Sequence, residues 1–212
     1  MFAKTLSSKT QKSLALLNTD ILPKNTYMAG GSALALHFGH RYSIDFDFFS
    51  PISFSSSDVV RRLKKIGSFI PQTVLKNTLL GSFNQVKFSL FLYKYPLVFS
   101  THKFLGISLA NPKDIGAMKI AAVMDRGTKK DFIDLYFLSK NDIDLETCFI
   151  IYNKKYKVLA NNIYSIITSL SYFVDAENSE MPQMIEKVNW EEVKKFFEKE
   201  AVRLGKKYLT KG

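Results

Sequence analysis

Met28-Ala-Gly-Gly-Ser32 is followed, twelve residues after its serine, by Ile44-Asp-Phe-Asp-Phe48. A Gly-Gly-Ser turn that opens a helix presents backbone N–H groups at the helix N-terminus, where the partial positive charge favours phosphate. In the second stretch, apolar and acidic residues alternate as in a β-strand. Asp45 and Asp47 therefore share one face of the predicted strand, and the three apolar residues share the other face.

Two carboxylates placed two residues apart on a strand can share divalent ions spaced about 3.5–4 Å, which clamp an in-line phosphoryl displacement. Without a metal the two charges repel each other. The alternatives are two aspartates on a solvated strand face and an ordinary tight turn with Ser32 as the helix N-cap. The turn is not a Walker loop, because no Gly-Lys-Ser/Thr follows it. Together, in this order, the two stretches favour a site for a metal-bound nucleoside triphosphate.

The net charge of +11 is unevenly distributed along the chain. Residues 1–110 hold 13 Lys and Arg but only four acids, whereas residues 111–212 hold 17 Lys and Arg and 15 acids. A basic field attracts polyanions such as nucleic acids and speeds their encounter with the protein. The alternative is a coding bias toward lysine without such a partner. Two of the four N-terminal acids are Asp45 and Asp47, which favours a specific role for them.

Cysteine content and hydropathy indicate a cytoplasmic protein. The single cysteine, Cys148, cannot form an internal disulfide, as expected in a reducing compartment. No apolar run approaches the roughly 18 residues of a membrane span. The apolar piece from Leu14 to Leu17 is too short for a signal peptide. We therefore expect no membrane association.

Hydrophobic periodicity changes from two to 3.6 near residue 110, which predicts an α+β fold with a short mixed sheet in residues 1–110 and an all-helical domain in 111–212. Strands are predicted at 27–29, 44–49, 69–75, 85–93 and 98–107, with a turn at 79–81. Helices are predicted at 10–18 (opened by Thr10), 33–38, 58–66, 111–124, 128–138, 145–157, 159–174 and 189–208, and a loop at 175–182.

A Gly-Gly-Ser/Thr helix start, followed by His40-Arg41-x-Ser43-x-Asp45-x-Asp47, resembles the polymerase-beta-like minimal nucleotidyltransferases. The chain is most similar to the AbiEii-like abortive-infection type IV toxin family, to which the MenT toxins are related. The likeness continues in order through Val86 to Pro96, Asp114-x-x-x-Met-Lys119, Arg126 to Tyr136 and Met181 to Trp190. It covers about residues 25–200, and it implies a polymerase-beta-like domain followed by the helical domain.

The resemblance implies a toxin that transfers a nucleoside monophosphate from an NTP, with Mg²⁺, to an acceptor. In related toxins the acceptor is often the 3′ end of tRNA, and a cognate antitoxin is the expected protein partner. In that interpretation Asp45 and Asp47 bind the metal. The triphosphate is held from the first domain, and the candidates for this are Gly30, Gly31, Ser32 and Arg41.

The same resemblance implies that the helical domain completes the nucleotide pocket, with Lys119 neutralising phosphate charge and Lys130 and Asp131 lining the site. Each residue has a structural alternative. Lys119 lies on an apolar helix and can extend its amine to solvent, and Asp131 follows Thr128 at the spacing of a capping acid. Asp134 lies one turn further on the same face and can replace Asp131. His37 and His40 are expected to pack rather than to bind a ligand.

The sequence departs from the polymerase-beta pattern at the third carboxylate. No Asp or Glu occurs between Asp58 and Asp114, and Ser89 stands where an acid is expected on the strand at 85–93. Three interpretations remain: Asp131 or Asp134 substitutes, solvent deprotonates the acceptor, or the protein only binds nucleotide. The alternative functions are accordingly a nucleotide-binding pseudoenzyme and a phosphoryl transferase acting on a partner protein.

Overall fold

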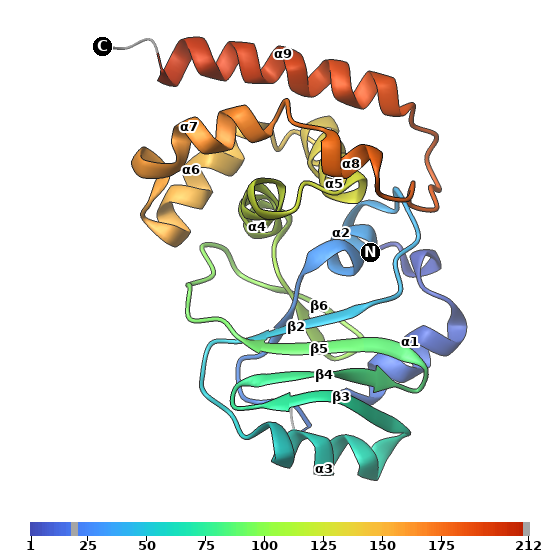
Figure 1. Ribbon diagram of the computed structural model, residues 1–212. Coiled ribbons are helices and arrows are strands. Elements are labelled where there is room, and N and C mark those ends of the chain that lie inside the picture. Colours follow the sequence, from blue (N-terminus) through green and yellow to red (C-terminus); the bar gives the residue numbers. More distant parts are fainter. Residues whose placement is uncertain (18–20, 210–212) are drawn as a thin grey trace. The chain divides into compact units, whose positions relative to one another are not determined.

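The structure, a computed structural model, describes residues 1–17 and 21–209 and divides into two compact units, Met1–Asn111 and Pro112–Gly212. The first unit contains a mixed sheet, and the second is built from helices (Figure 1). The fold class is α+β, as predicted. The last residue of the predicted helix at 10–18 lies outside the described residues.

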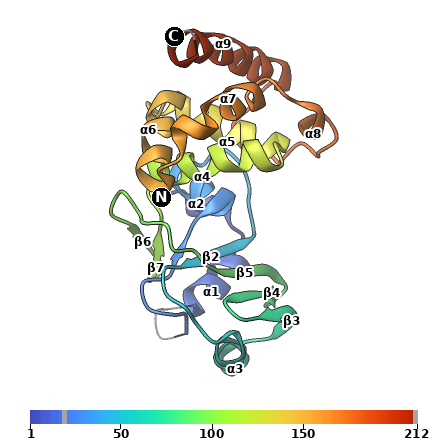
Figure 2. The ribbon, with the colours of Figure 1, turned by 60° about the vertical axis from the view of Figure 1, so that its left-hand side comes forward.

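Within the described residues of the first unit, seven strands form one sheet in the order β3-β4-β5-β2-β1-β7-β6. β2 runs parallel to β5, whereas β3, β4 and β5 form an antiparallel meander. The strands are β1 (Tyr27–Met28), β2 (Phe46–Ser50), β3 (Phe69–Leu75), β4 (Thr78–Phe83), β5 (Val86–Leu92), β6 (His102–Phe104) and β7 (Ile107–Leu109). The unit is completed by the 3-10 helix η1 (Ala3–Thr5) and the helices α1 (Ser8–Leu16), α2 (Gly30–Phe38) and α3 (Ser56–Ile66). α3 packs against β3 and β4, at one edge of the sheet (Figure 2).

Alternation places the core of this unit as predicted. Phe46 and Phe48 of β2 and Phe88 and Leu90 of β5 are buried, and the rings of Phe48 and Phe88 contact each other at 5.6 Å between centroids. Ile44 was expected on the same buried face, and this expectation was wrong. Pairing with β5 begins only at Phe46, so Ile44 lies before the strand and is exposed.

Two strand predictions are corrected. The turn predicted at 79–81 is part of β4, and the chain reverses at Asn77, whose φ is +63°. Gly81 is a glycine because a Cβ there would lie 2.4 Å from the carbonyl oxygen of Ile70, so the strands could not approach as they do. The strand predicted at 98–107 is instead the β6–β7 hairpin, which turns at Leu105 and Gly106.

Helix starts follow the side chains that satisfy their first N–H groups. Ser7, rather than Thr10, caps α1 by accepting from the Thr10 N–H. Ser55 caps α3, which begins two residues before its predicted start. The hydroxyls of these serines are the acceptors that a helix N-terminus requires. α2 ends at Gly39, as predicted.

The second unit begins with α4 (Pro112–Asp125) and α5 (Lys129–Lys140). The remaining helices are α6 (Leu145–Tyr156), α7 (Leu159–Ser169), α8 (Val174–Glu177) and α9 (Trp190–Tyr208). The predicted helix at 159–174 stops five residues early, and α8 occupies the start of the predicted loop at 175–182. Among the described helices, none has both the length and the apolar composition needed to cross a membrane.

Candidate functional site

β2 and β5 place Asp47 beside Ser89. The two residues are register partners, and the Ser89 hydroxyl donates to Asp47 Oδ1 at 2.7 Å. Asp45 lies in the segment just before β2, and both carboxylates are half-buried. Ser89 thus occupies the position at which the sequence lacks a third acid. Its hydroxyl holds one oxygen of Asp47 in place.

The charges of Asp45 and Asp47 are not compensated within their own unit. Asp58, the other acid described there, pairs with Arg61 at 2.8 Å. No lysine or arginine among residues 1–17 and 21–111 forms an ion pair with Asp45 or Asp47. Two carboxylates so close in the chain and without an ion-pair partner repel each other, and a bound cation would relieve that repulsion.

Gly30 brings the start of α2 against Asp47. Its φ is +74°, a conformation that side chains other than glycine rarely adopt. A Cβ at this position would lie 3.1 Å from Asp47 Oδ2, and the Ala29 N–H donates to the Asp47 carbonyl at 3.0 Å. The N-terminal turn of the helix and the carboxylate are therefore immediate neighbours. A helix N-terminus, where partial positive charge favours phosphate, thus lies beside a carboxylate oxygen, which is a possible metal ligand.

Ser32 does not cap α2, contrary to the prediction, because the N-cap position is Ala29. Ser32 is buried in the first turn, and its hydroxyl forms a hydrogen bond of 2.8 Å with the hydroxyl of Ser43. Since Ser43 lies two residues before Asp45, this bond ties the helix start to the segment that carries the first carboxylate. Sequence reasoning assigned no role to Ser43, although it lies within the motif.

Other residues of the motif are packed into the unit. Arg41 is buried, and its Nη1 donates to the Tyr42 carbonyl at 3.2 Å. The Nε2 of His37 lies 2.9 Å from the carbonyl oxygen of Ala110, and burial lowers the pKa of His37 to about 4. His40 is buried against the ring of Phe38. The two histidines pack, as expected.

In the second unit, the amine of Lys119 lies between two buried carboxylates, 2.8 Å from Asp131 Oδ1 and 2.6 Å from Asp134 Oδ2. The alternative that Lys119 extends its amine to solvent does not hold, because its side chain is only 6% exposed. The spacing of three residues puts both acids on one face of α5. Sequence reasoning treated Asp134 only as a substitute for Asp131, whereas the structure shows both binding the same amine.

Asp131 has two further partners. Arg126 Nε donates to Oδ2 at 3.1 Å, and the Thr128 hydroxyl donates to the same oxygen at 2.6 Å. Burial raises the pKa of Asp131, but the charges of Lys119 and Arg126 outweigh burial and hold this pKa below its ordinary range. Lys130 is exposed.

The donor set of the first unit fits a small, hard cation. Asp45 and Asp47 offer carboxylate oxygens, and Mg²⁺ is commonly held by one or two carboxylates together with substrate phosphates. No group of three or more His, Cys, Asp or Glu in the described part of the chain is arranged to hold a metal ion. A cation held by these two carboxylates would take its further ligands from water or from the phosphates of a bound molecule.

Comparison with known proteins identifies the family. The model of the nucleotidyl transferase AbiEii toxins of type IV toxin–antitoxin systems matches residues 14–206. An uncharacterized protein of Aquifex aeolicus (strain VF5) is 41% identical over 188 residues, which cover 86% of this chain and 87% of that protein.

Two solved structures share the fold at low identity. JHP933 from Helicobacter pylori has a TM-score of 0.58 at 18% identity, covering 96% of this chain and 94% of its own. MenT4, a nucleotidyltransferase toxin from Mycobacterium tuberculosis H37Rv, has a TM-score of 0.59 at 15% identity, covering 92% and 85%. Because the family model matches residues 14–206, which is nearly the whole chain, the chain belongs to the AbiEii nucleotidyl transferase toxin family.

Proposed function

We propose that this toxin-family transferase moves a nucleoside monophosphate from an NTP to the 3′ end of an RNA acceptor, with tRNA the foremost candidate, and that it uses Mg²⁺. The observation that carries the proposal is the pair Asp45 and Asp47, uncompensated within a basic unit and adjoining the Gly30 start of α2. Family membership supports the reaction class. The charge of residues 1–110 supports a polyanionic acceptor.

Each residue of the first unit has a proposed task. Asp45 and Asp47 would hold Mg²⁺, and the first turn of α2, with Gly30 and Gly31, would receive the phosphates. Bound Mg²⁺ supplies charge neutralisation on the triphosphate. Ser89 fixes Asp47 Oδ1 by its hydrogen bond and thereby orients the carboxylate.

In the second unit, Lys119 is the proposed cation for phosphate, with exposed Lys130 as a second. Asp131 and Asp134 would position the Lys119 amine between them. Asp131 is a weak proton acceptor, because neighbouring cations hold its pKa down. We therefore propose that solvent takes the proton of the acceptor hydroxyl, and that Asp131 acts on catalysis through Lys119.

The test is parallel labelling with α- and γ-³²P-labelled NTPs, Mg²⁺, total tRNA and lysate protein. We expect α-label on RNA, and a fall of at least about 10²-fold in Asp47→Asn, since metal placement is required for the transfer. Asp58→Asn is the matched control, because it removes an acid of the same unit that is already paired with Arg61.

The other outcomes select other functions. Label from the γ-phosphate on protein would identify a phosphoryl transferase, such as one acting on a cognate antitoxin. Binding of NTP in calorimetry, without label on any RNA or protein, would identify a nucleotide-binding protein. Equal labelling by Asp47→Asn and the wild type would remove Asp47 from the site.

A further inference from the structure

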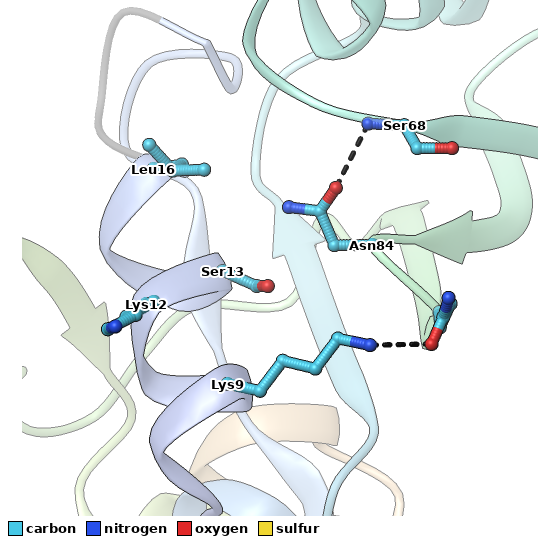
Figure 3. Close-up of a pocket in the computed structure, with 7 residues that line it drawn as sticks. Lys9, Lys12, Ser13, Leu16, Ser68 and Asn84 are labelled. Atoms are coloured by element: carbon cyan, nitrogen blue, oxygen red, sulfur yellow. Dashed lines mark hydrogen bonds between the residues drawn. The ribbon is translucent and has the colours of Figure 1, made fainter.

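A pocket of about 460 Å³ lies between α1 and the turn that joins β4 to β5 (Figure 3). The proposed transfer reaction assigns it no task. Six of its seven described lining residues carry an ammonium, hydroxyl or amide group, and none is an acid. The lining residues are Lys9, Lys12, Ser13, Leu16, Ser68, Asn84 and Gln85. Such a set of donors suits a phosphate group.

Hydrogen bonds fix the far wall of this pocket. Asn84 and Gln85 both have positive φ values, +49° and +70°, and form the tight β4–β5 turn. Asn84 Oδ1 accepts from the Ser68 N–H at 2.9 Å, and the Asn84 N–H donates to the Ser68 carbonyl at 2.8 Å. Lys9 Nζ donates to Gln85 Oε1 at 2.5 Å across the opening. The pocket is thus built from rigid turns, with one lysine already aimed across it.

The sheet topology places this pocket and Asp45 at the same end of the sheet, where β2, β3 and β5 begin. β2 is parallel to β5, and β3 is related to β5 through two antiparallel pairings, so all three strands run in one direction. Asp45 precedes β2, Gln85 precedes β5 and Ser68 precedes β3. Strands that run in the same direction begin at the same end of the sheet.

The separation between the pocket and Asp47 follows from the strand. Gln85 lies four residues before Ser89, which is the register partner of Asp47. At about 3.3 Å per residue this is about 13 Å along β5. Exposed Lys87 lies between them, on the same face of the strand as Ser89. In a base-stacked strand the phosphates advance about 3.4 Å along the axis per nucleotide, so 13 Å spans about four stacked nucleotides.

We infer that this pocket binds a backbone phosphate of the RNA acceptor, about four nucleotides from the reacting 3′ end, with Lys9 and Lys12 as its cations. The inference rests on the proposed transfer to RNA and adds the path of the strand over the first unit. Contacts to phosphate carry no sequence information, so the pocket positions the strand and does not select its bases.

The test compares two double variants that remove the same charge from the two opposite ends of the strands. Lys9→Gln with Lys12→Gln alters the pocket. Lys76→Gln with Lys94→Gln is the control, because these exposed lysines follow the ends of β3 and β5. Both pairs lower the net charge of the unit by two, so general attraction for a polyanion weakens equally. Thermal unfolding verifies that each variant is folded.

The first readout is affinity for a 12-nucleotide single-stranded RNA, measured by anisotropy without NTP over a series of salt concentrations. Removing the cations that neutralise one phosphate lowers the slope of log K against log salt by about 0.7. We expect this change and about tenfold weaker binding at low salt for the Lys9 and Lys12 variant, but not for the control. Equal weakening of the two variants would overturn the inference. If the double variant unfolds, Lys12→Gln alone against Lys76→Gln gives the same comparison, with a slope change of at most about 0.7.

The second readout is transfer to acceptors of two lengths. A dinucleotide is too short to reach the pocket, so the two variants should use it with equal kcat/KM. The 12-nucleotide acceptor should show a raised KM with unchanged kcat for the Lys9 and Lys12 variant. A raised KM for NTP instead would assign the pocket to the nucleotide and overturn the inference. Absence of any transfer by the wild type would refute the proposed function, whereas the binding experiment would still decide on the pocket.

Discussion

Replacement of Gly30 by alanine tests whether the start of α2 positions the Asp47 carboxylate. The new Cβ would lie 3.1 Å from Asp47 Oδ2, which is closer than the ordinary contact distance of 3.4–4 Å. The backbone also has a φ of +74°, which an alanine adopts at a cost. Gly106 is a matched control, because its φ is +82° and a Cβ there would meet nothing within 4 Å.

The two effects have separable magnitudes. The left-handed conformation costs an L-residue roughly 1–2 kcal/mol, so both Gly30→Ala and Gly106→Ala should lose about that much free energy of unfolding. In Gly30→Ala the carboxylate must also move by a few tenths of an ångström. Displacements of about 1 Å reduce rates about 10²-fold, so we expect about a tenfold lower transfer rate, or about 1.4 kcal/mol in the barrier.

The assay is α-label transfer with a Mg²⁺ titration, at a temperature where urea unfolding shows both variants fully folded. Gly30→Ala should need more Mg²⁺ and turn over more slowly, whereas Gly106→Ala should match the wild type. If the two variants have equal rates and equal Mg²⁺ dependence, α2 does not position Asp47, and the argument from the Gly30 contact fails.

Four further expectations concern the second unit. Lys119→Met removes the cation that pairs with the buried carboxylates of Asp131 and Asp134. It should lower the free energy of unfolding, measured in urea, by about 3–5 kcal/mol. The pKa of Asp131 is lower in the folded protein than its unfolded value of about 3.9, so the ionised carboxylate stabilises the fold above about pH 3.9, and this stabilisation is lost as the pH falls toward the folded pKa. In urea unfolding, the difference in stability between the wild type and Asp131→Asn should therefore shrink on acidification. Lys155 and Asp114 form a buried pair at 3.2 Å, so Lys155→Met should destabilise strongly, and the double variant with Asp114→Leu should recover most of the loss. Burial raises the pKa of Cys148 to about 12, so iodoacetamide at pH 8 should modify it only as fast as the protein unfolds.

Local patterns predicted what local physics controls. Alternation located the buried phenylalanines of β2 and β5, and the spacing of Asp45 and Asp47 identified the candidate metal pair before any geometry was known. The turn expected at 79–81 failed because Gly81 reflects a close strand approach, and a single sequence does not distinguish that use of glycine from a turn.

Contacts between distant segments could not be predicted in this way. Ser89 was identified as the place of a missing acid, but its hydrogen bond to Asp47 depends on the parallel register of β2 and β5. For Lys119, the apolar composition of its own helix left extension to solvent open as an alternative to a role in the site. Its two partners lie on α5, so the compensation of its charge becomes visible only once α4 and α5 pack together.

β3, one of the two edge strands of the described sheet, has a consequence for the solubility of the protein. β3 ends the strand order and exposes Ile70, Val74 and Leu75, a composition that favours edge-to-edge association of chains. Pro71 lacks an N–H, and the register of β3 against β4 shifts between Pro71 and Thr73. The proline and the irregularity interrupt the row of hydrogen-bonding groups that a second chain would need. They protect a toxin-family protein from aggregation through its own sheet.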